Sequence, residues 1–226
     1  MPKGIGSSTK TLVVVAVLAL AGCTKSADTT PQGLADRLLD VTDMPGDWQE
    51  TQRDVFTTRG NENPSLDPST WCPDASDEAA GLIDLAGDAG ADVEMQMQLD
   101  GAEVPRLMRL QAWRNDSTRR YFEEVLTVVN ICDGAKWTQD PGVTTEMWKI
   151  DGPEVGDESV SWGAQLVPPQ GKEQAASTGR TTVARIGEVI MVLQVGDFTA
   201  SSSVGELSDA DWREIVQRAA DKLADA

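Results

Sequence analysis

The chain has 226 residues, of which 37 are acidic, 19 are basic and none is histidine, so its formal net charge is -18 at pH 7. This charge argues against binding to nucleic acid and against docking of the protein surface on anionic lipid head groups. Without histidine there is no imidazole base for a Ser-His-Asp or Cys-His site and no histidine-ligated zinc.

The first residues have the pattern of a secretory signal peptide. Lys3 and Lys10 make the start positive, residues 11–20 are almost wholly apolar, and the motif LAGC occupies residues 20–23. A transmembrane helix and an ordinary cleaved signal are the alternatives, but the apolar run is about half of the roughly 20 residues that span a bilayer. LAGC resembles the lipobox of bacterial lipoproteins, which implies cleavage before Cys23 and attachment of diacylglycerol to its thiol.

We therefore predict three parts: a signal peptide over residues 1–22, a lipidated tether over 23–30 and a single extracytoplasmic domain over 31–226. The leader carries two lysines and no acidic residue, so its removal changes the net charge from -18 to -20. Because so acidic a surface is repelled by anionic head groups, the acyl chains must hold the protein at the cell membrane. The two or three chains of a lipoprotein anchor bind firmly.

The cysteine count supports a disulfide. Lipidation of Cys23 leaves Cys72 and Cys132, and an exported chain lies outside the reducing cytosol, so we expect these two to pair. Two buried free thiols are the alternative. A metal site lacks further ligands because histidine is absent, and we interpret the acidic runs 84–92 and 151–158 as solvated surface charge rather than calcium loops. We predict neither a metal nor a cofactor.

Hydrophobic periodicity predicts the secondary structure. In the first two thirds of the chain we expect helices over 31–39, 77–86 (capped by Ser76) and 117–131, and strands over 49–57, 93–99, 106–113, 144–150 and 159–167. A loop over 168–179 leads to a hairpin of 180–186 and 189–195, and Ser208 with Asp211 forms a capping box for a last helix. Val189–Val195 is apolar throughout, which is typical of a central strand covered on both faces. This pattern predicts an α+β domain whose mainly antiparallel sheet is layered with helices.

Four short motifs accompany this order of elements: MPGDW at 44–48, ICDG at 131–134, GDES at 156–159 and RIGEVI at 185–190. Together they resemble the family of extracellular sensor domains found in actinobacterial lipoproteins and in the receptor kinase PknH. The resemblance covers about residues 31–226. It implies a PsbP-like α/β/α sandwich with a cleft for an unidentified ligand. Since this chain contains no kinase, any sensing would be passed to another protein.

Three residues are candidates for ligand binding. The chain has seven tryptophans against one tyrosine and three phenylalanines, and exposed indoles are a common platform for sugars and apolar ligands. Trp48, Trp137 and Trp148 lie near polar segments, and the last two are the candidates that we select. Arg185 is a charge within an apolar hairpin and is suited to binding an anionic group. Packing in the core or at the sheet edge is the alternative for all three.

The leading hypothesis is a membrane-anchored extracytoplasmic lipoprotein with a non-catalytic ligand-binding or sensor-like domain. Its partner is an unidentified small ligand or envelope protein. The alternative is a structural or protein-interaction module of the cell envelope, and a third possibility is a carboxylate-dependent hydrolase, whose acids cannot be ranked from sequence. A concave pocket holding Trp148 or Arg185 would favour a small ligand, whereas an exposed apolar patch would favour a protein partner.

Overall fold

The computed structural model describes residues 28–57, 71–85, 89–100, 105–114, 116–140, 142–167, 176–199 and 207–224. The predicted leader, Cys23 and most of the tether lie outside these residues. In this part of the chain, no helix is long and apolar enough to cross a membrane.

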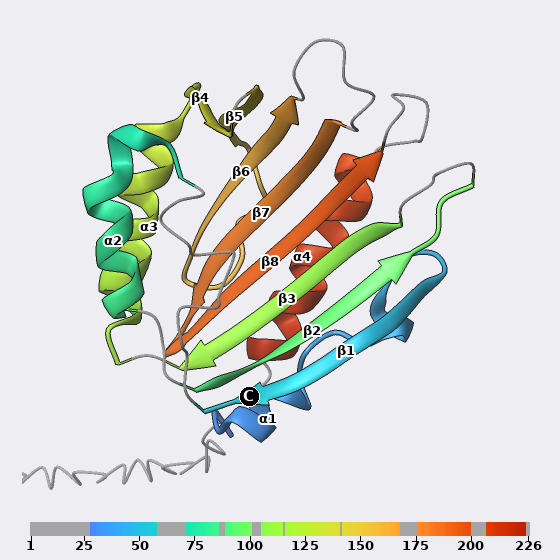
Figure 1. The fold of residues 1–226 in the computed structure, drawn as a ribbon. Coiled ribbons are helices and arrows are strands. Elements are labelled where there is room, and N and C mark those ends of the chain that lie inside the picture. Colours follow the sequence, from blue (N-terminus) through green and yellow to red (C-terminus); the bar gives the residue numbers. More distant parts are fainter. Residues whose placement is uncertain are drawn as a thin grey trace, which may run out of the picture.

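Eight strands form one antiparallel sheet, in the order β1-β2-β3-β8-β7-β6-β5-β4 (Figure 1). The strands are β1 Trp48–Phe56, β2 Gly90–Met97, β3 Arg106–Arg114, β4 Lys136–Asp140, β5 Val143–Ile150, β6 Glu158–Val167, β7 Ala176–Ile186 and β8 Val189–Thr199. The described helices are α1 Pro31–Ala35, α2 Ser76–Leu85, α3 Thr118–Cys132 and α4 Asp209–Ala224, with 3-10 turns at Val41–Asp43 (η1) and Pro73–Ala75 (η3).

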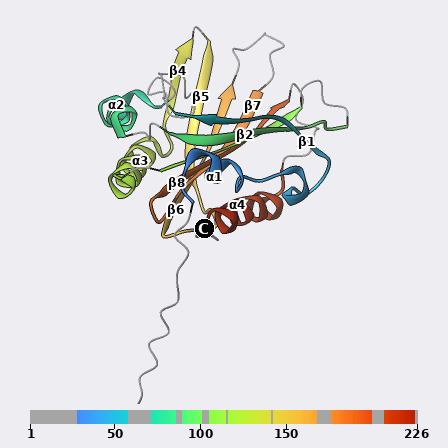
Figure 2. The same ribbon diagram turned by 90° about the horizontal axis from the view of Figure 1, so that it is seen from below.

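Helices cover both faces of the sheet. Successive strand residues point to opposite faces, so Val183 packs with α2 and α3 whereas its neighbour Ala184 packs with α1 and α4. Figure 1 shows α4 behind the sheet and α2 beside α3 at its left, and Figure 2 shows α1 and α4 on the same side. The molecule is therefore an α+β protein with an α/β/α arrangement, as predicted.

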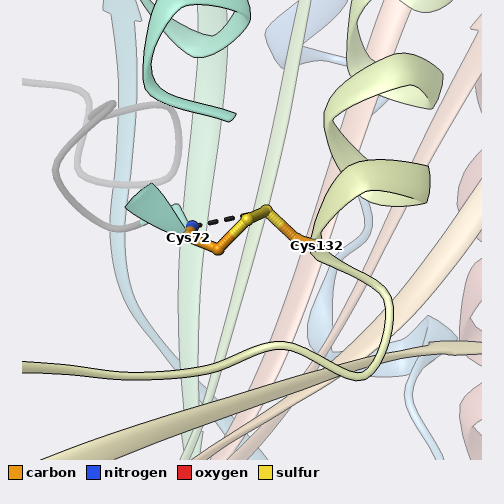
Figure 3. Close-up of a disulfide and its surroundings, with 2 residues drawn as sticks. All are labelled: Cys72 and Cys132. Atoms are coloured by element: carbon orange, nitrogen blue, oxygen red, sulfur yellow. Dashed lines mark hydrogen bonds between the residues drawn. A yellow bond between two sulfur atoms is a disulfide. The ribbon is translucent and has the colours of Figure 1, made fainter. Parts of the chain in front are cut away.

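The predicted disulfide joins Cys72 to Cys132 across a sequence separation of 60 residues. Cys132 ends α3 and Cys72 precedes η3, so the bond ties the long helix to the segment that starts α2 (Figure 3). Both residues are buried, and the backbone N–H of Cys72 donates a hydrogen bond to Cys132 Sγ at 3.3 Å. The bond therefore lies inside the α2/α3 layer.

Both predicted hairpins are confirmed. Strand β2 pairs with β3 and β7 pairs with β8, while Ser208 Oγ accepts a hydrogen bond from the Asp211 N–H at the start of α4. The central position of β8, between β3 and β7, is also as predicted.

Several boundaries differ from the predictions, and one strand was not predicted. Helix α1 ends at Ala35 instead of residue 39, and Ser76 is the first residue of α2 instead of its cap, because η3 leads directly into that helix. Strand β7 starts at Ala176, inside the predicted loop, because residues 176–179 pair with 196–199 of β8. Strand β4 was not predicted at all: it is short, polar and paired with β5 at the sheet edge.

Candidate functional site

A cavity of about 480 Å³ lies between the sheet and the first turn of α4. Its strand residues occur at alternate positions, which places them on the face that α4 covers. The lining residues are Trp148, Ile150, Asp151, Gly163, Gln165, Thr178, Arg180, Val195, Leu207, Asp209, Trp212 and Arg213. The volume falls within the roughly 300–1,000 Å³ typical of small-molecule sites.

One wall of the cavity is the Trp148 indole, which lies over a glycine on the neighbouring strand. Trp148 of β5 is the cross-strand partner of Gly163 of β6. A Cβ atom at position 163 would lie 2.5 Å from Trp148 Cε2, so a larger residue would displace the ring. The missing side chain at Gly163 therefore lets the indole lie close to the sheet and form a flat apolar wall.

The cavity is also lined by two arginines whose guanidinium groups lie near one indole. The Cζ atoms of Arg180 and Arg213 lie 5.5 and 6.0 Å from the centre of the Trp212 ring, a distance typical of cation–π contacts. Trp212 is buried, and its Nε1 has no hydrogen-bond partner among the described residues. The indole thus helps to position both cations at the cavity.

Each cavity arginine also contacts an aspartate at the rim. Arg180 Nη1 lies 2.5 Å from Asp209 Oδ1, and Arg213 Nη2 lies 3.8 Å from Asp151 Oδ2 and donates to the Asp151 carbonyl. The Asp209 side chain is 80% exposed, whereas that of Arg180 is 24% exposed. Asp151 is exposed as well. The carboxylates therefore face solvent, while the guanidinium of Arg180 is turned toward the protein.

Of the three candidate residues, only Trp148 lines the cavity. Arg185 lies near the β7–β8 turn and pairs with Asp157 and Glu158, at 2.8 Å each. Trp137 of β4 is 8% exposed and packs in the core beneath α3. The structure thus separates the three residues that the sequence grouped together.

Sequence reasoning did not single out Arg180, Arg213 or Trp212 as residues of a site. Trp212 is buried and also lines the cavity. One available signal was Gly163 within the alternating pattern of its strand, because an isolated strand glycine often marks a close approach of another group.

A second hollow, of about 450 Å³, lies on the opposite face of the sheet beyond α2 and α3. Leu107 and Leu166 line it and are 41% and 40% exposed. Arg109 also lines it and forms ion pairs with Asp92 at 3.1 Å and Glu94 at 3.4 Å. We call this hollow the Leu166 groove. It is an apolar surface on a part of the sheet that these helices leave open.

Metal coordination has no candidate in the described part of the chain: no three Cys, Asp or Glu side chains gather there as ligands. The prediction that the chain takes no metal remains a prediction, since the acidic run 84–92 is only partly described.

The fold and the cavity together define an α+β domain with helices on both faces of one antiparallel sheet and a ligand-sized space under its last helix. No family model and no curated protein matches the sequence. Among solved structures, the extracellular domain of PknH from Mycobacterium tuberculosis is similar, with a TM-score of 0.56 and 9% identity, covering 87% of this chain and 97% of that domain. The resemblance inferred from the sequence motifs is thus confirmed at the level of the fold.

A second solved structure, an uncharacterized protein from Mycobacterium smegmatis that is the Rv0999 ortholog, has a TM-score of 0.47 and 11% identity. The match covers 79% of this chain and 88% of that protein.

Proposed function

We propose that this chain is an extracytoplasmic, membrane-anchored lipoprotein whose domain binds a small ligand in the cavity beside Trp148. The cavity is the observation that carries the proposal, because it is large enough for a small molecule and combines apolar walls with a few polar groups. The similarity of the fold to the extracellular domain of PknH supports an extracytoplasmic location. The LAGC motif supports the lipid anchor.

The chemistry of the cavity favours binding over catalysis. Its two carboxylates, Asp151 and Asp209, each lie beside an arginine and face solvent. In a hydrolase of the carboxylate type two carboxyl groups flank the bond to be cleaved, whereas here each aspartate is exposed and paired with an arginine. The absence of histidine removes the commonest general base. We therefore propose a sensor-like domain without catalytic activity.

Binding in the cavity is tested with N-phenylnaphthylamine, an uncharged dye that fluoresces in apolar surroundings. The full-length protein in mild detergent is titrated with the dye, and Trp148→Ala is compared with Leu166→Ala in the groove on the opposite face. We expect Trp148→Ala to weaken binding about tenfold, because stacking on an indole is worth about 1 kcal/mol or more. Loss of binding in Leu166→Ala with no change in Trp148→Ala would contradict the proposal.

The lipid anchor is tested by metabolic labelling with an alkyne analogue of palmitate. We expect label on the wild-type chain and recovery in the membrane fraction. Cys23→Ala should lose both, since Cys23 supplies the thiol that carries diacylglycerol. A labelled Cys23→Ala chain would show that the anchor lies elsewhere.

A second candidate function is a protein-interaction module, which the Leu166 groove favours. Exposed apolar surface of this kind is typical of docking sites. The two functions are separated by the same pair of variants: Leu166→Asp should abolish capture of a partner protein while leaving dye binding beside Trp148 unchanged. If it abolishes dye binding instead, the groove and not the cavity is the small-molecule site.

A further inference from the structure

We infer that the cavity selects an amphiphilic anion, in which a carboxylate or phosphate group joined to an apolar body pairs with Arg180 and Arg213. The inference rests on the proposed function and adds the chemical class of the ligand.

Two positive charges lie at this cavity although the chain as a whole is very acidic. The whole sequence has a net charge of -18, yet two arginines line this one cavity. They come from different elements, Arg180 from β7 and Arg213 from the first turn of α4, and both lie against the Trp212 ring. Two guanidinium groups placed in this way are suited to binding one oxyanion, because each offers several donors in a planar fork.

The existing partners of these arginines can be replaced. Asp209 and Asp151 are held at the exposed rim, where an ion pair is worth about 1 kcal/mol or less. A ligand oxyanion inside the cavity would be less hydrated than these aspartates and would interact more strongly with the guanidiniums. Replacement of Asp209 by the ligand oxyanion as the partner of Arg180 is therefore favourable when the ligand also buries apolar surface.

The rest of the cavity supplies that apolar surface. Trp148, Ile150, Val195 and Leu207 line it, and the last two are buried members of the core that packs on α4. A simple inorganic anion would leave these walls uncovered. An anion with an aromatic or short aliphatic body would cover them and gain roughly 25 cal/mol for each Å² of apolar surface removed from water.

A cationic ligand is the competing interpretation, since tryptophans and aspartates also bind quaternary ammonium groups. The arrangement of charged groups at the cavity disfavours a cationic ligand. The Trp212 face already lies near two guanidinium groups, and the two carboxylates that line the cavity are exposed and already paired with those guanidiniums. A cation would therefore meet like charge inside the cavity.

The test uses two dyes that differ by one anionic sulfonate group: anilinonaphthalene sulfonate and its uncharged parent N-phenylnaphthylamine. Full-length wild-type protein is titrated with both, alongside Arg180→Gln and Arg213→Gln. Arg185→Gln is the matched control, because Arg185 lies on the same strand and is also ion-paired, with its side chain 21% exposed, but lies outside the cavity. Arg180→Lys keeps the charge in case the glutamine variant loosens α4, and thermal unfolding confirms that each variant is folded.

We expect wild-type protein to bind the sulfonate dye about tenfold more tightly than the neutral dye, since a charge-assisted hydrogen bond is worth about 1.5 kcal/mol or more. Arg180→Gln and Arg213→Gln should each remove most of this preference, Arg180→Lys should retain part of it, and Arg185→Gln should retain all of it. Phenylacetate, benzylphosphonate and benzyltrimethylammonium then compete with the dye. The better of the first two identifies the head group as carboxylate or phosphate.

Three results would overturn the inference. Equal binding of the two dyes, with both still dependent on Trp148, would leave the binding function intact but remove the selection of anions. Displacement by benzyltrimethylammonium alone would assign the cavity to cations. Dye binding that does not depend on Trp148 at all would refute the proposed function itself, and the inference with it.

Discussion

At the scale of single residues, the position of the Trp148 indole depends on the absence of a side chain at Gly163. Glycine is the only residue type at position 163 that lets the Trp148 indole lie against β6, because a Cβ atom there would lie 2.5 Å from the ring. The space for a ligand therefore depends on a contact between two residues that are paired across β5 and β6.

Substitution of Gly163 should disturb both stability and the cavity. We expect Gly163→Ala to lower the free energy of unfolding by about 1–3 kcal/mol, because the added methyl group overpacks the strand against the Trp148 ring. Gly179→Ala on β7 is the matched control, since its new Cβ atom would lie 3.6 Å from the nearest atom. Denaturant unfolding measures both, and equal effects of the two variants would contradict this account of the wall.

Of the two arginines Arg180 and Arg185, the sequence pointed to the one that does not line the cavity. Both belong to β7, and the sequence singled out Arg185 because it interrupts an apolar hairpin. Its charge is instead satisfied by Asp157 and Glu158 from the preceding loop and strand β6. Arg180 looked ordinary, because its role depends on α4 folding back over the sheet from nearly thirty residues further along the chain. Such long-range juxtaposition has no local signal.

At the scale of elements, side-chain contacts hold α4 in place near both of its ends. Its first turn holds the cavity residues Trp212 and Arg213, and near its last turn Lys222 Nζ lies 2.5 Å from Asp43 Oδ2 and 3.3 Å from Asp40 Oδ2. Arg218 also donates to the Asp43 carbonyl. These contacts hold α4 against the segment around η1. They therefore fix the position of the helix that covers the cavity.

The Asp40 and Lys222 pair makes this fastening depend on pH. Hydrogen bonds from Thr42 lower the pKa of Asp40 to about 2, and Lys222 contributes to the shift. Burial by itself would lower the pKa of Lys222, but the hydrogen bonds and charges of Asp43 and Asp40 raise it above its usual value. The Asp40 contribution to stability is therefore present above its unfolded pKa of about 3.9 and is lost as the pH falls toward 2. The Lys222 contribution is present below about pH 10.4 and is lost as the pH rises through the raised pKa.

Asp40→Asn tests the acid side of this dependence. At pH 7 we expect the variant to be less stable by about 1 kcal/mol or less, because the pair is half exposed and screened by water. The difference from wild type should shrink between pH 4 and pH 2, as the Asp40 carboxyl becomes protonated in the native wild-type protein. Denaturant midpoints at pH 7, 4 and 2 measure it. A constant difference across this range would contradict the assignment.

The disulfide is a second link between elements. Closing the loop between Cys72 and Cys132 should contribute about 4 kcal/mol in the chain-entropy model, which is an upper estimate. We expect Cys72→Ala combined with Cys132→Ala to lower the free energy of unfolding by roughly 2–4 kcal/mol. A reducing agent should destabilise wild type by a similar amount and leave the double variant unchanged. No loss of stability in either case would mean that the bond does not constrain the unfolded chain.

At the scale of the whole molecule, the layers were predictable, whereas of the cavity residues the sequence pointed to Trp148 but not to the two arginines. Alternation in β2 identifies a strand with one wet face, and the apolar run of β8 identifies the central strand, because these patterns reflect burial on one or on both faces. Strand β4 escaped prediction because its short, polar sequence carries no such pattern. The cavity draws Trp148, Arg180 and Arg213 from three elements, and only the packing of α4 on the sheet brings them together.

The proposed function requires that a small ligand occupies the cavity beside Trp148. Native mass spectrometry of full-length protein, extracted in detergent from the cell that makes it, tests for this ligand, with Trp148→Ala prepared in parallel. The account predicts an added small-molecule mass on wild-type protein that Trp148→Ala loses. Wild-type protein without any added mass, or the same added mass on both proteins, would contradict it.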